Sequence, residues 1–409
     1  MSVERTETVV IGGGQAGLTM SHGLSRLGRP HVVLERHRIA ERWRTERWES
    51  LRFQFPNWAM RLPGFGYTGD APDVFAPRDE VVQFIEGYAA FIRAPVRTGI
   101  DVRRVGRTPG ADGFLIETDA GTMIAHNVVF ATGPYQRPVI PDAAQGVGDV
   151  VQIAAGAYRD PDQLPAGGVL VVGSGASGCQ IAEELMRAGR SVCLSVGLHR
   201  RIPRRYRGKD VIWWITELGL DDKIADEAAM RQAPLLISGA YGGNTVDLRG
   251  YAAAGMVLLG RMLDARDGVV GFAPDLTENL AKGDESFAGF LRIADAHVDR
   301  HGLALPAEHL PVTTFPEPTG DIASLDLRAA GIGSVIWATG YRYDFDWIDL
   351  DVFDPSTRAP RHRRGVTEVP GAYFLGLPML HKTKSSFLSG VGEDADFLAD
   401  RIADRVPTA

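Results

Sequence analysis

Short apolar runs followed by glycine loops occur twice along the chain. Residues 9–11 (Val-Val-Ile) lead into Gly12-Gly13-Gly14-Gln15-Ala16-Gly17, and residues 169–172 (Val-Leu-Val-Val) lead into Gly173-Ser174-Gly175-Ala176-Ser177-Gly178. Each pattern predicts a buried strand, a G-x-G-x-x-G turn and a helix. The repeat therefore predicts two units of the kind that bind a dinucleotide through its phosphates.

The elements expected around the two loops follow the same order. In the first unit we expect a strand over residues 8–11, a helix over 15–27 and a strand over 31–34 that ends at Glu35. In the second unit the corresponding ranges are 169–172, 177–188 and 191–194, and the last strand ends at Ser195. Because strand, glycines, helix and strand recur in this order, the signal is much stronger than one isolated G-x-G-x-x-G.

Two further apolar runs end in the same tripeptide. Residues 128–133 read Val-Val-Phe-Ala-Thr-Gly and residues 335–340 read Val-Ile-Trp-Ala-Thr-Gly. In a nested two-domain protein, such strands lie beside the nucleotide sheets and lead the chain back between the domains. The plainer alternative is a pair of buried strands with a glycine turn.

The pattern changes between about residues 204 and 305, where apolar positions follow helical spacing at 210–218, 248–263 and 286–301. We therefore expect an α/β protein with two Rossmann-like (three-layer ββα) dinucleotide-binding domains and a largely helical insertion. The first predicted dinucleotide-binding domain is 1–150 plus 341–409, and the second is 151–205 plus 306–340. Residues 206–305 form the insertion, a candidate substrate lid.

Composition narrows the class of protein. The chain has 409 residues, a hydrophobic content of 44% and a net charge of −7, which argues against general nucleic-acid binding. No apolar run reaches the roughly 18 residues of a membrane span, and the first strand starts too early for a cleaved signal peptide. Two cysteines, Cys179 and Cys193, form neither a disulfide framework nor a metal cluster. We therefore expect a cytoplasmic protein without a metal or a membrane anchor.

The residue at the end of each second strand indicates which dinucleotide binds there. Glu35 can accept both ribose hydroxyls and would repel a 2′-phosphate, which suits FAD or NAD, and we expect FAD in the first domain. Ser195 is followed by Arg200 and Arg201 with no acid between them, and a hydroxyl with guanidinium groups suits the 2′-phosphate of NADPH. A solvated basic loop is the alternative. For residues 204–207 (Arg-Arg-Tyr-Arg), contact with an acidic substrate or with NADPH and a solvated loop both stay open.

Residues 41–57 are candidates for the flavin ring site. An isoalloxazine ring needs flat apolar walls and a few amide-type hydrogen-bond groups, and this segment contains Trp43, Trp48, Gln54 and Asn57. Packing in the core is the alternative for each tryptophan.

These motifs resemble the class B flavin-dependent monooxygenases, the group with FMO-type N- and S-oxygenases, plant auxin-forming oxygenases and Baeyer–Villiger enzymes. The resemblance covers most of the chain outside the insertion. Besides the glycine loops and the Ala-Thr-Gly strands, it is carried by Glu35-Arg36, Trp43-Arg44, residues 77–82 and residues 389–395. One family fingerprint, F-x-G-x-x-x-H-x-x-x-[WY] before the second loop, is absent, because residues 134–172 contain neither histidine nor phenylalanine. This departure weakens a Baeyer–Villiger or typical FMO assignment.

The resemblance implies a monooxygenase that uses FAD, NADPH and O2 through a flavin C4a-(hydro)peroxide to oxygenate a small organic substrate at nitrogen, sulfur or carbon. It implies that Gln54 stands where FMO-type members have an active-site asparagine, with Asn57 as a neighbour. The candidate catalytic residues are therefore Gln54 and Asn57, whose amides would orient the peroxide or the nicotinamide. The expected cofactor-binding residues are Gly12, Gly14, Gln15, Ala16, Gly17, Glu35, Arg36, Trp43, Arg44, Thr132, Gly133, Gly173, Gly175, Ala176, Ser177, Gly178, Ser195, Arg200, Arg201, Thr339, Gly340 and Gly392.

Other functions stay open at this stage. An NADPH-dependent flavin reductase or oxidase without oxygen insertion needs the same two dinucleotides. A disulfide reductase of the C-x-x-C type is excluded by the spacing of Cys179 and Cys193. A redox sensor without turnover would need an output module, and none is marked in the sequence. The oligomeric state is not determined by these patterns, and a homodimer remains an open alternative.

Overall fold

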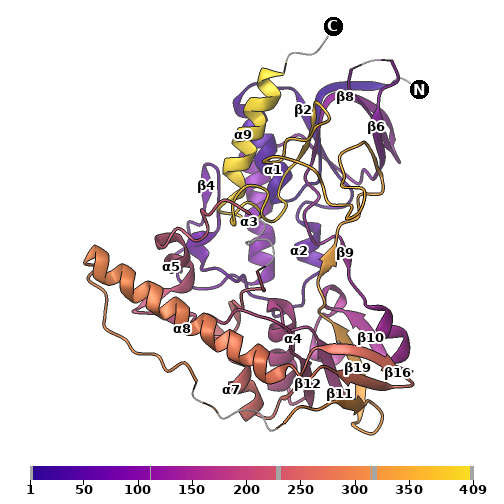
Figure 1. Ribbon diagram of the computed structural model, residues 1–409. Coiled ribbons are helices and arrows are strands. Elements are labelled where there is room, and N and C mark those ends of the chain that lie inside the picture. The colour runs from indigo at the N-terminus through magenta and orange to yellow at the C-terminus, as the bar shows by residue number, and fades with distance from the viewer. Residues whose placement is uncertain (1–2, 111, 227–231, 314, 316–319, 406–409) are drawn as a thin grey trace.

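The computed structural model describes residues 3–110, 112–226, 232–313, 315 and 320–405. Figure 1 shows two bodies, one above the other, each built on a sheet. They are joined through β9 (Arg137–Pro138) and β20 (Tyr341–Arg342), which pair in antiparallel fashion. The chain therefore passes between the bodies twice at one place.

The upper body contains both the N-terminal unit and the C-terminal helix. Its sheet has the order β21-β6-β7-β8-β1-β2-β5, with β22 also paired to β8. The strands are β1 (Glu4–Ile11), β2 (His31–Glu35), β5 (Val96–Thr98), β6 (Val102–Arg107), β7 (Phe114–Thr118), β8 (Gly121–Phe130), β21 (Ile348–Asp349) and β22 (Ala372–Phe374). Strands β2, β1, β8 and β22 run parallel, so their carboxyl ends lie at one edge.

Helices α1 (Gln15–Arg26), α3 (Arg78–Phe91) and α9 (Val391–Asp404) belong to the upper body, together with the short α2 (Glu41–Thr45). Helix α1 lies so close to α9 that a Cβ atom on Gly23 would lie 3.1 Å from the Cβ of Ala399. Short elements complete this part of the chain: η1 (Asn57–Ala59), β3 (Arg61–Leu62) and β4 (Phe65–Gly66). The C-terminal segment thus returns to the first unit and packs on its helix.

The lower body repeats the arrangement. Its sheet has the order β10-β19-β11-β12-β15 and is parallel throughout. The strands are β10 (Val151–Ala154), β11 (Gly168–Val172), β12 (Val192–Ser195), β15 (Val257–Leu259) and β19 (Ile332–Trp337). Helix α4 (Ala176–Arg187) follows β11, and a three-stranded antiparallel sheet is made of β16 (Met262–Arg266), β17 (Val269–Phe272) and β18 (Ser324–Asp326).

The remaining elements form a third, smaller core beside the lower body. It is centred on the fully buried Trp214 and includes Tyr206, Val211 and Phe290. The indole N–H of Trp214 donates to the carbonyl oxygen of Tyr206 at 2.9 Å, so this tryptophan is a packing residue. The elements around it are β13 (Arg205–Tyr206), β14 (Lys209–Asp210), α5 (Val211–Glu217) and the long α8 (Leu276–His301) at the left of Figure 1. Helix α7 (Leu248–Ala253) packs instead in the core of the lower body.

The predicted α/β fold with two Rossmann-like dinucleotide-binding units is confirmed, and every strand and helix of the two units lies within two residues of its expected range apart from the longer start of β1. The expectation of one largely helical insertion is wrong in part. The helix expected over residues 248–263 ends at Ala253, because Gly255 takes a φ of +105°, and β15 and β16 follow. The strand β15 extends the parallel sheet, so part of the insertion belongs structurally to the second unit.

Among the described residues, none of the helices combines the length and the hydropathy of a membrane span.

Candidate active site

Each glycine loop places its helix directly against the preceding strand. A Cβ atom on Gly17 would lie 1.9 Å from the carbonyl oxygen of Gly12, and a Cβ atom on Gly178 would lie 1.9 Å from that of Gly173. Gly12 and Gly173 have φ angles of +116° and +106°, which glycine adopts without strain. At these four positions the close approach or the φ angle of the backbone requires glycine.

The middle glycine of each loop faces open space instead. A Cβ atom on Gly14 or on Gly175 would meet no atom within 4 Å. Helices α1 and α4 begin here without a side-chain cap, so their first N–H groups are free to bind an anion. Both loops therefore have the room and the donors that a dinucleotide pyrophosphate requires.

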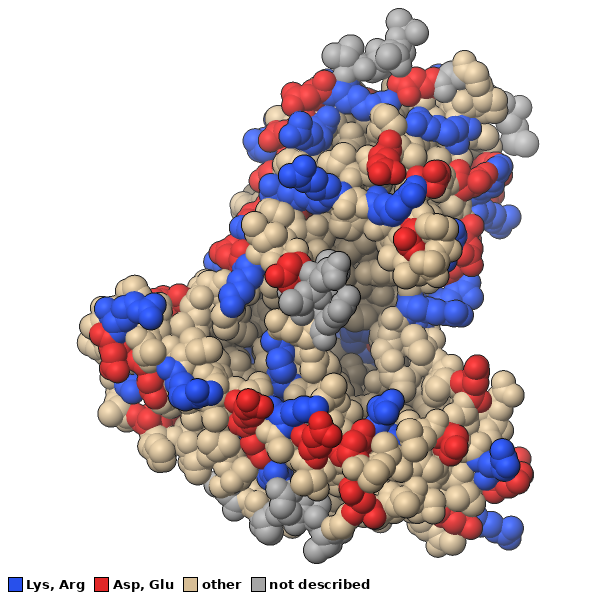
Figure 2. Space-filling view, in the orientation of Figure 1, with Lys and Arg blue, Asp and Glu red and all other residues tan. Residues whose placement is uncertain are grey.

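One cavity of about 900 Å³ reaches from the first loop to the second. Figure 2 shows the surface hollowed between the upper and lower parts of the molecule. Both bodies contribute to the lining, which brings most of the predicted residues together. Those that line it are Gly12, Gly14, Gln15, Ala16, Glu35, Arg36, Trp43, Gln54, Thr132, Gly133, Gly175, Ala176, Ser177 and Gly340.

Glu35 lies at the end of β2, at the rim of the first loop. The N–H of Gly13 donates to its Oε2 at 2.7 Å, and the N–H of His37 donates to its Oε1 at 2.8 Å. These bonds fix the carboxylate at the cavity and leave lone pairs for other donors. The arrangement suits two ribose hydroxyls, as the sequence predicts.

The prediction that Ser195 binds a dinucleotide is wrong, because the pairing between strands, and not the distance from the glycine loop, decides which residue ends beside a ligand. In the first unit the residue before the glycine loop pairs with Leu34, and in the second unit it pairs with Ser195. Ser195 therefore corresponds to Leu34, and Val196 corresponds to Glu35.

The Ser195 side chain points into the structure rather than toward a ligand. It is buried, its hydroxyl donates to the carbonyl oxygen of Gly260 at 3.0 Å, and the N–H of Met262 donates to it at 3.0 Å. Because the apolar Val196 takes the place of the acid, this unit still has no carboxylate at the position that would repel a 2′-phosphate.

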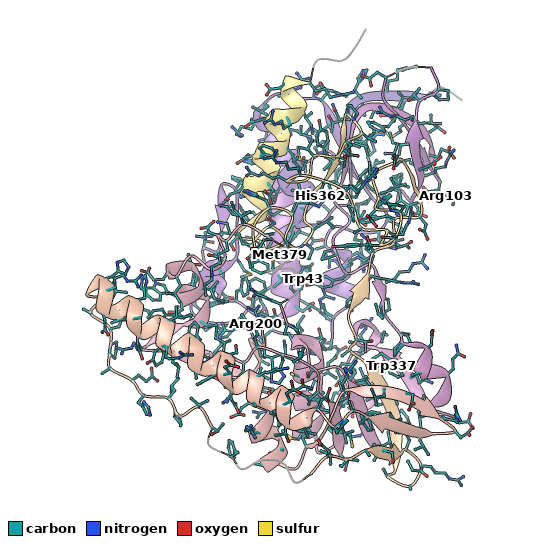
Figure 3. The ribbon with its side chains drawn as sticks, in the orientation of Figure 1. Trp43, Arg103, Arg200, Trp337, His362 and Met379 are labelled. Carbon is teal, nitrogen blue, oxygen red and sulfur yellow. The ribbon has the colours of Figure 1, made fainter. Side chains whose placement is uncertain are left out.

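The two predicted arginines differ in their surroundings. Arg201 is buried and donates to Asp284 at 2.9 Å and to Asp247 at 3.0 Å, so its guanidinium is already paired and the prediction that it binds NADPH is wrong. Arg200 is half-buried between the two bodies (Figure 3) and donates to the side-chain oxygen of Gln232 at 2.5 Å. Its N–H donates to Pro234, a residue of the cavity lining, so Arg200 remains a candidate.

Aromatic rings form one wall of the cavity. Ring centroids are 6.2 Å apart for Trp43 and Phe53, 5.5 Å for Phe53 and Phe55, and 5.2 Å for Phe55 and Phe387. Figure 3 shows Trp43 at the middle of the molecule, where the bodies meet. Trp48 also borders the cavity, but most of its side chain is buried in the core of the lower body. Phe387 could not be found from the sequence, because it lies in a segment with no local signal.

The two predicted catalytic amides also differ. Gln54 lines the cavity, and among the described residues its side chain makes no hydrogen bond. Asn57 is buried outside the cavity lining, and its Nδ2 donates to the carbonyl oxygen of Ala71 at 3.0 Å. The prediction that Asn57 faces the reaction site is therefore wrong, and Gln54 is the amide available to a ligand.

The two Ala-Thr-Gly turns lie where the chain crosses between the bodies. Thr132 and Gly133 line the cavity. The hydroxyl of Thr339 donates to the carbonyl oxygen of Val139, and the N–H of Val139 donates to the carbonyl oxygen of Gly340 at 2.9 Å. Thr339 is therefore a linker contact, while Gly340 reaches the cavity.

Two further predicted residues lie outside the cavity lining. Arg44 forms an ion pair with Glu86. Gly392 lies in the first turn of α9, where a Cβ atom would come within 2.9 Å of the Pro63 ring. Both have structural partners instead of a ligand.

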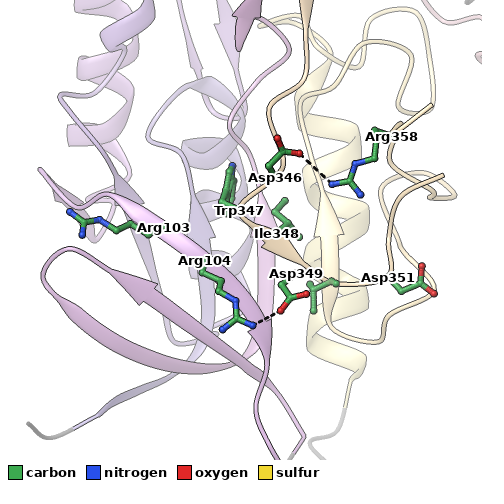
Figure 4. A pocket seen from close by; sticks show the side chains of 9 residues that line it. Arg103, Arg104, Asp346, Trp347, Ile348, Asp349, Asp351 and Arg358 are labelled. Carbon is green, nitrogen blue, oxygen red and sulfur yellow. Dashed lines mark hydrogen bonds and ion pairs between the residues drawn. The ribbon is translucent and has the colours of Figure 1, made fainter. Parts of the chain in front are cut away.

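A second groove, of about 580 Å³, lies at the edge of the upper sheet, beside β6 and β21 (Figure 4). Its arginines are largely paired with acids: Arg104 with Asp349, and Arg358 with Asp346 at 3.5 Å. It is lined by no residue of either glycine loop, so we assign no chemistry to it.

The family described as pyridine nucleotide-disulphide oxidoreductase matches residues 9–217, just over half of the chain. This chain belongs to that family. An uncharacterized CzcO-like oxidoreductase of Geobacillus kaustophilus (strain HTA426) is 31% identical over 401 residues, which cover 97% of this chain and 98% of that protein. A probable indole-3-pyruvate monooxygenase, YUCCA3 of Arabidopsis thaliana, is 28% identical and covers 97% of this chain and 86% of the relative.

The fold is also that of a solved flavin-containing monooxygenase from Stenotrophomonas maltophilia, with a TM-score of 0.65, 18% identity and coverage of 98% of this chain and 99% of that chain. The predicted resemblance to flavin-dependent monooxygenases is thus confirmed, and the chain is an oxidoreductase of the flavin and nicotinamide-nucleotide type. The open cradles at Gly14 and Gly175 fit FAD and NADPH, the two cofactors expected.

Members of a pyridine nucleotide-disulphide oxidoreductase family that reduce disulfides need a reactive thiol. Cys179 and Cys193 are both buried in the lower body, and burial raises the pKa of Cys179 to about 12 and that of Cys193 to about 11. Neither lines the cavity, and a protonated thiol is a poor nucleophile. These two cysteines are therefore unsuited to disulfide chemistry.

Proposed function

We propose that the chain is an NADPH-dependent FAD monooxygenase that oxygenates a small organic substrate. The observation that carries the proposal is a cavity that joins two open phosphate cradles and has an aromatic wall. Among the described residues that line it, one amide side chain is unpartnered and none is a cysteine. The residues proposed to hold FAD are Gly12, Gly14, Gln15, Ala16, Glu35, Arg36, Trp43, Thr132 and Gly133. Those proposed to hold NADPH are Gly175, Ala176, Ser177, Arg200 and Gly340.

When bound, FAD supplies hydride acceptance from NADPH and activation of dioxygen. The contribution of the protein is to orient the two dinucleotides and to keep water away from the reacting atoms. Phe53, Phe55 and Phe387 provide the apolar surface for this exclusion. The Gln54 amide offers both donors and an acceptor at the cavity, and we assign it the role of orienting the oxygen or the nicotinamide.

The competing function is an NADPH-dependent flavin reductase or oxidase without oxygen insertion. The same cavity and cradles would serve it, and the absence of the F-x-G-x-x-x-H-x-x-x-[WY] fingerprint favours it. The two functions differ in where the electrons of NADPH go: into an oxygenated product and water, or into hydrogen peroxide.

The test is a substrate panel with NADPH, oxygen, product and hydrogen peroxide measured together. Indole-3-pyruvate belongs in the panel because relatives at this similarity are named for it; thioethers, amines and ketones extend it. We expect at least one compound to give product in proportion to NADPH consumed. Stoichiometric peroxide with every compound would assign the chain to the oxidase alternative.

A further inference from the structure

A buried arginine ties the third core to the cavity wall. The Arg204 side chain is 2% exposed, and its Nη1 donates to the carbonyl oxygen of Gln54 at 2.7 Å and to that of Ser238 at 3.2 Å. Its Nε and Nη2 donate to the two oxygens of Asp210 at 2.9 and 3.1 Å. The guanidinium also lies 4.3 Å from the ring centre of Phe75. The basic segment 204–207 is therefore not a solvated loop at this position.

The backbone around Gln54 is held from both sides. The N–H of Phe53 donates to the carbonyl oxygen of Ala76 at 2.7 Å. On the opposite side, Gly239 lies so close that a Cβ atom on it would come within 2.0 Å of the Phe53 carbonyl oxygen. Gly239 and Arg204 thus contact two successive carbonyl groups, those of Phe53 and Gln54.

We propose that Arg204 is a positioning residue that sets the direction of the Gln54 side chain by fixing the peptide group that follows it. Arg204 is outside the cavity lining, so it touches neither cofactor nor substrate and acts only through Gln54. The inference rests on the proposed role of Gln54. This role also gives the third core a function, because Arg204 links that core to the Gln54 backbone at one wall of the cavity.

The chemistry of the guanidinium explains why another residue would not suffice. Its planar fork makes two parallel bonds to a carboxylate and still has donors for two carbonyl groups. A lysine ammonium has three donors without a fixed plane, so it cannot hold Asp210 and both carbonyl groups in the same geometry. Buried ion pairs are often no more stabilising than apolar residues of the same volume, so geometry is the better account of this one.

The experiment compares Arg204→Lys with Arg205→Lys in the FAD-bound full-length protein. Arg205 is the matched control, because it also donates to backbone carbonyl groups, those of Gly242 and Gly243, but makes no contact with Gln54. The readouts are the visible spectrum of the bound flavin, the rate of its anaerobic reduction by NADPH, and the product formed per NADPH. We expect Arg204→Lys to lower the reduction rate and the product yield by about tenfold and to shift the flavin spectrum, since a charge-assisted hydrogen bond is lost.

A double variant separates positioning from a general loss of structure. If Arg204 acts through Gln54, adding Arg204→Lys to Gln54→Ala will change the three readouts no further. Additive effects, or equal effects of the lysine variants at 204 and 205, would overturn the proposal. Should Arg204→Lys fail to fold, Asp210→Asn weakens the hold on the same guanidinium while keeping an acceptor for the N–H of Ile212, and it is expected to reproduce the spectral and rate changes, with no change as the contrary result.

The flavin spectrum and the anaerobic rate need no oxygen insertion. If the wild-type protein gives only peroxide, the proposed function fails while these two readouts still decide the role of Arg204.

Discussion

Single side chains at the cavity differ in whether their hydrogen-bonding capacity is already used. Glu35 accepts two backbone bonds and still has lone pairs at the cavity, whereas Arg201 has two carboxylates as internal partners. The carboxylates that pair with Arg201 lie 83 and 46 residues away in the chain. A local run of basic residues therefore could not reveal that the guanidinium of Arg201 is already paired. The local order of strand, glycines, helix, strand and acid was enough to predict that Glu35 ends a strand beside the first glycine loop.

Replacing Glu35 tests the first dinucleotide site. We expect Glu35→Ala to weaken FAD binding by about 10- to 100-fold, because hydrogen bonds donated to a charged acceptor contribute about 1.5–3 kcal/mol. FAD retention after gel filtration and titration of the apoprotein with FAD measure the change. Glu49→Ala, an exposed acid of the same charge outside the cavity lining, is the control and is expected to retain FAD. Equal retention by the two variants would remove the role of Glu35.

Arg200 and Arg201 make a second test, in which adjacent arginines give different phenotypes. Arg200→Ala is expected to raise KM for NADPH about tenfold with little change for NADH, because a charge-assisted contact to the 2′-phosphate is lost. Arg201→Ala is expected instead to lower the free energy of unfolding by about 1.5–3 kcal/mol, because Asp247 and Asp284 lose a charge-assisted partner, although Asp284 keeps its ion pair with Arg249. Steady-state kinetics with both coenzymes and thermal melts separate the two. An unchanged NADPH/NADH preference in Arg200→Ala would contradict the assignment.

At the scale of secondary-structure elements, the repeated unit was predictable because its determinants are local. These determinants are glycines with positive φ, an apolar strand and a helix C-cap. They lie within about 25 residues of one another, at spacings that one strand–turn–helix geometry sets. The register of Ser195 was missed because the pairing between strands, and not distance from the glycine loop, decides which residue ends beside a ligand. The strand β15 was missed because a three-residue apolar run has no period that distinguishes strand from helix.

The two glycine types in each unit predict opposite outcomes for the same substitution. Gly14→Ala leaves the fold intact, because no atom lies near the new Cβ, but lowers FAD affinity by about tenfold or more through loss of close pyrophosphate contact. Gly17→Ala is expected to destabilise the apoprotein by about 1–3 kcal/mol or more, because its Cβ would overlap a backbone oxygen. Thermal melts of the apoprotein and FAD titrations measure these effects.

The matched variant in the second unit is Gly175→Ala, which is expected to keep FAD and to raise KM for NADPH. A loss of FAD from Gly175→Ala, or a fully stable Gly17→Ala, would show that the two loops do not have the separate roles proposed.

At the scale of the whole molecule, the cavity depends on contacts between segments far apart in the chain. Residues 221–225 lie along residues 381–384: the N–H of Thr383 donates to Lys223 and that of Lys384 to Asp221, both at 3.1 Å. Four charges reinforce this contact, since the ammonium groups of Lys382 and Lys384 each lie within 2.9 Å of Asp222 and of Glu393. Phe387, in the cavity wall, follows directly.

Hydrogen bonds from Lys382 and Lys384 lower the pKa of Asp222. A carboxyl whose folded-state pKa is depressed stabilises the fold above its ordinary pKa, and this contribution is lost as the pH falls through the depressed value. Near neutral pH the contact between these lysines and Asp222 is therefore fully charged. A substitution is needed to weaken it, since a small change of pH near neutrality will not.

Asp222→Asn tests whether this contact closes the cavity from the side of residues 381–385. We expect amide hydrogen exchange in residues 381–385 to accelerate about two- to fivefold, because exposed ion pairs contribute about 0.2–1 kcal/mol each. Glu285→Gln, an exposed acid on α8, is the control. The difference between Asp222→Asn and wild type is expected to shrink in 1 M salt, where screening extends to about 3 Å. If residues 381–385 exclude water from the reaction, Asp222→Asn will also release more hydrogen peroxide per NADPH. Faster amide exchange without extra peroxide would show that the contact contributes only to stability.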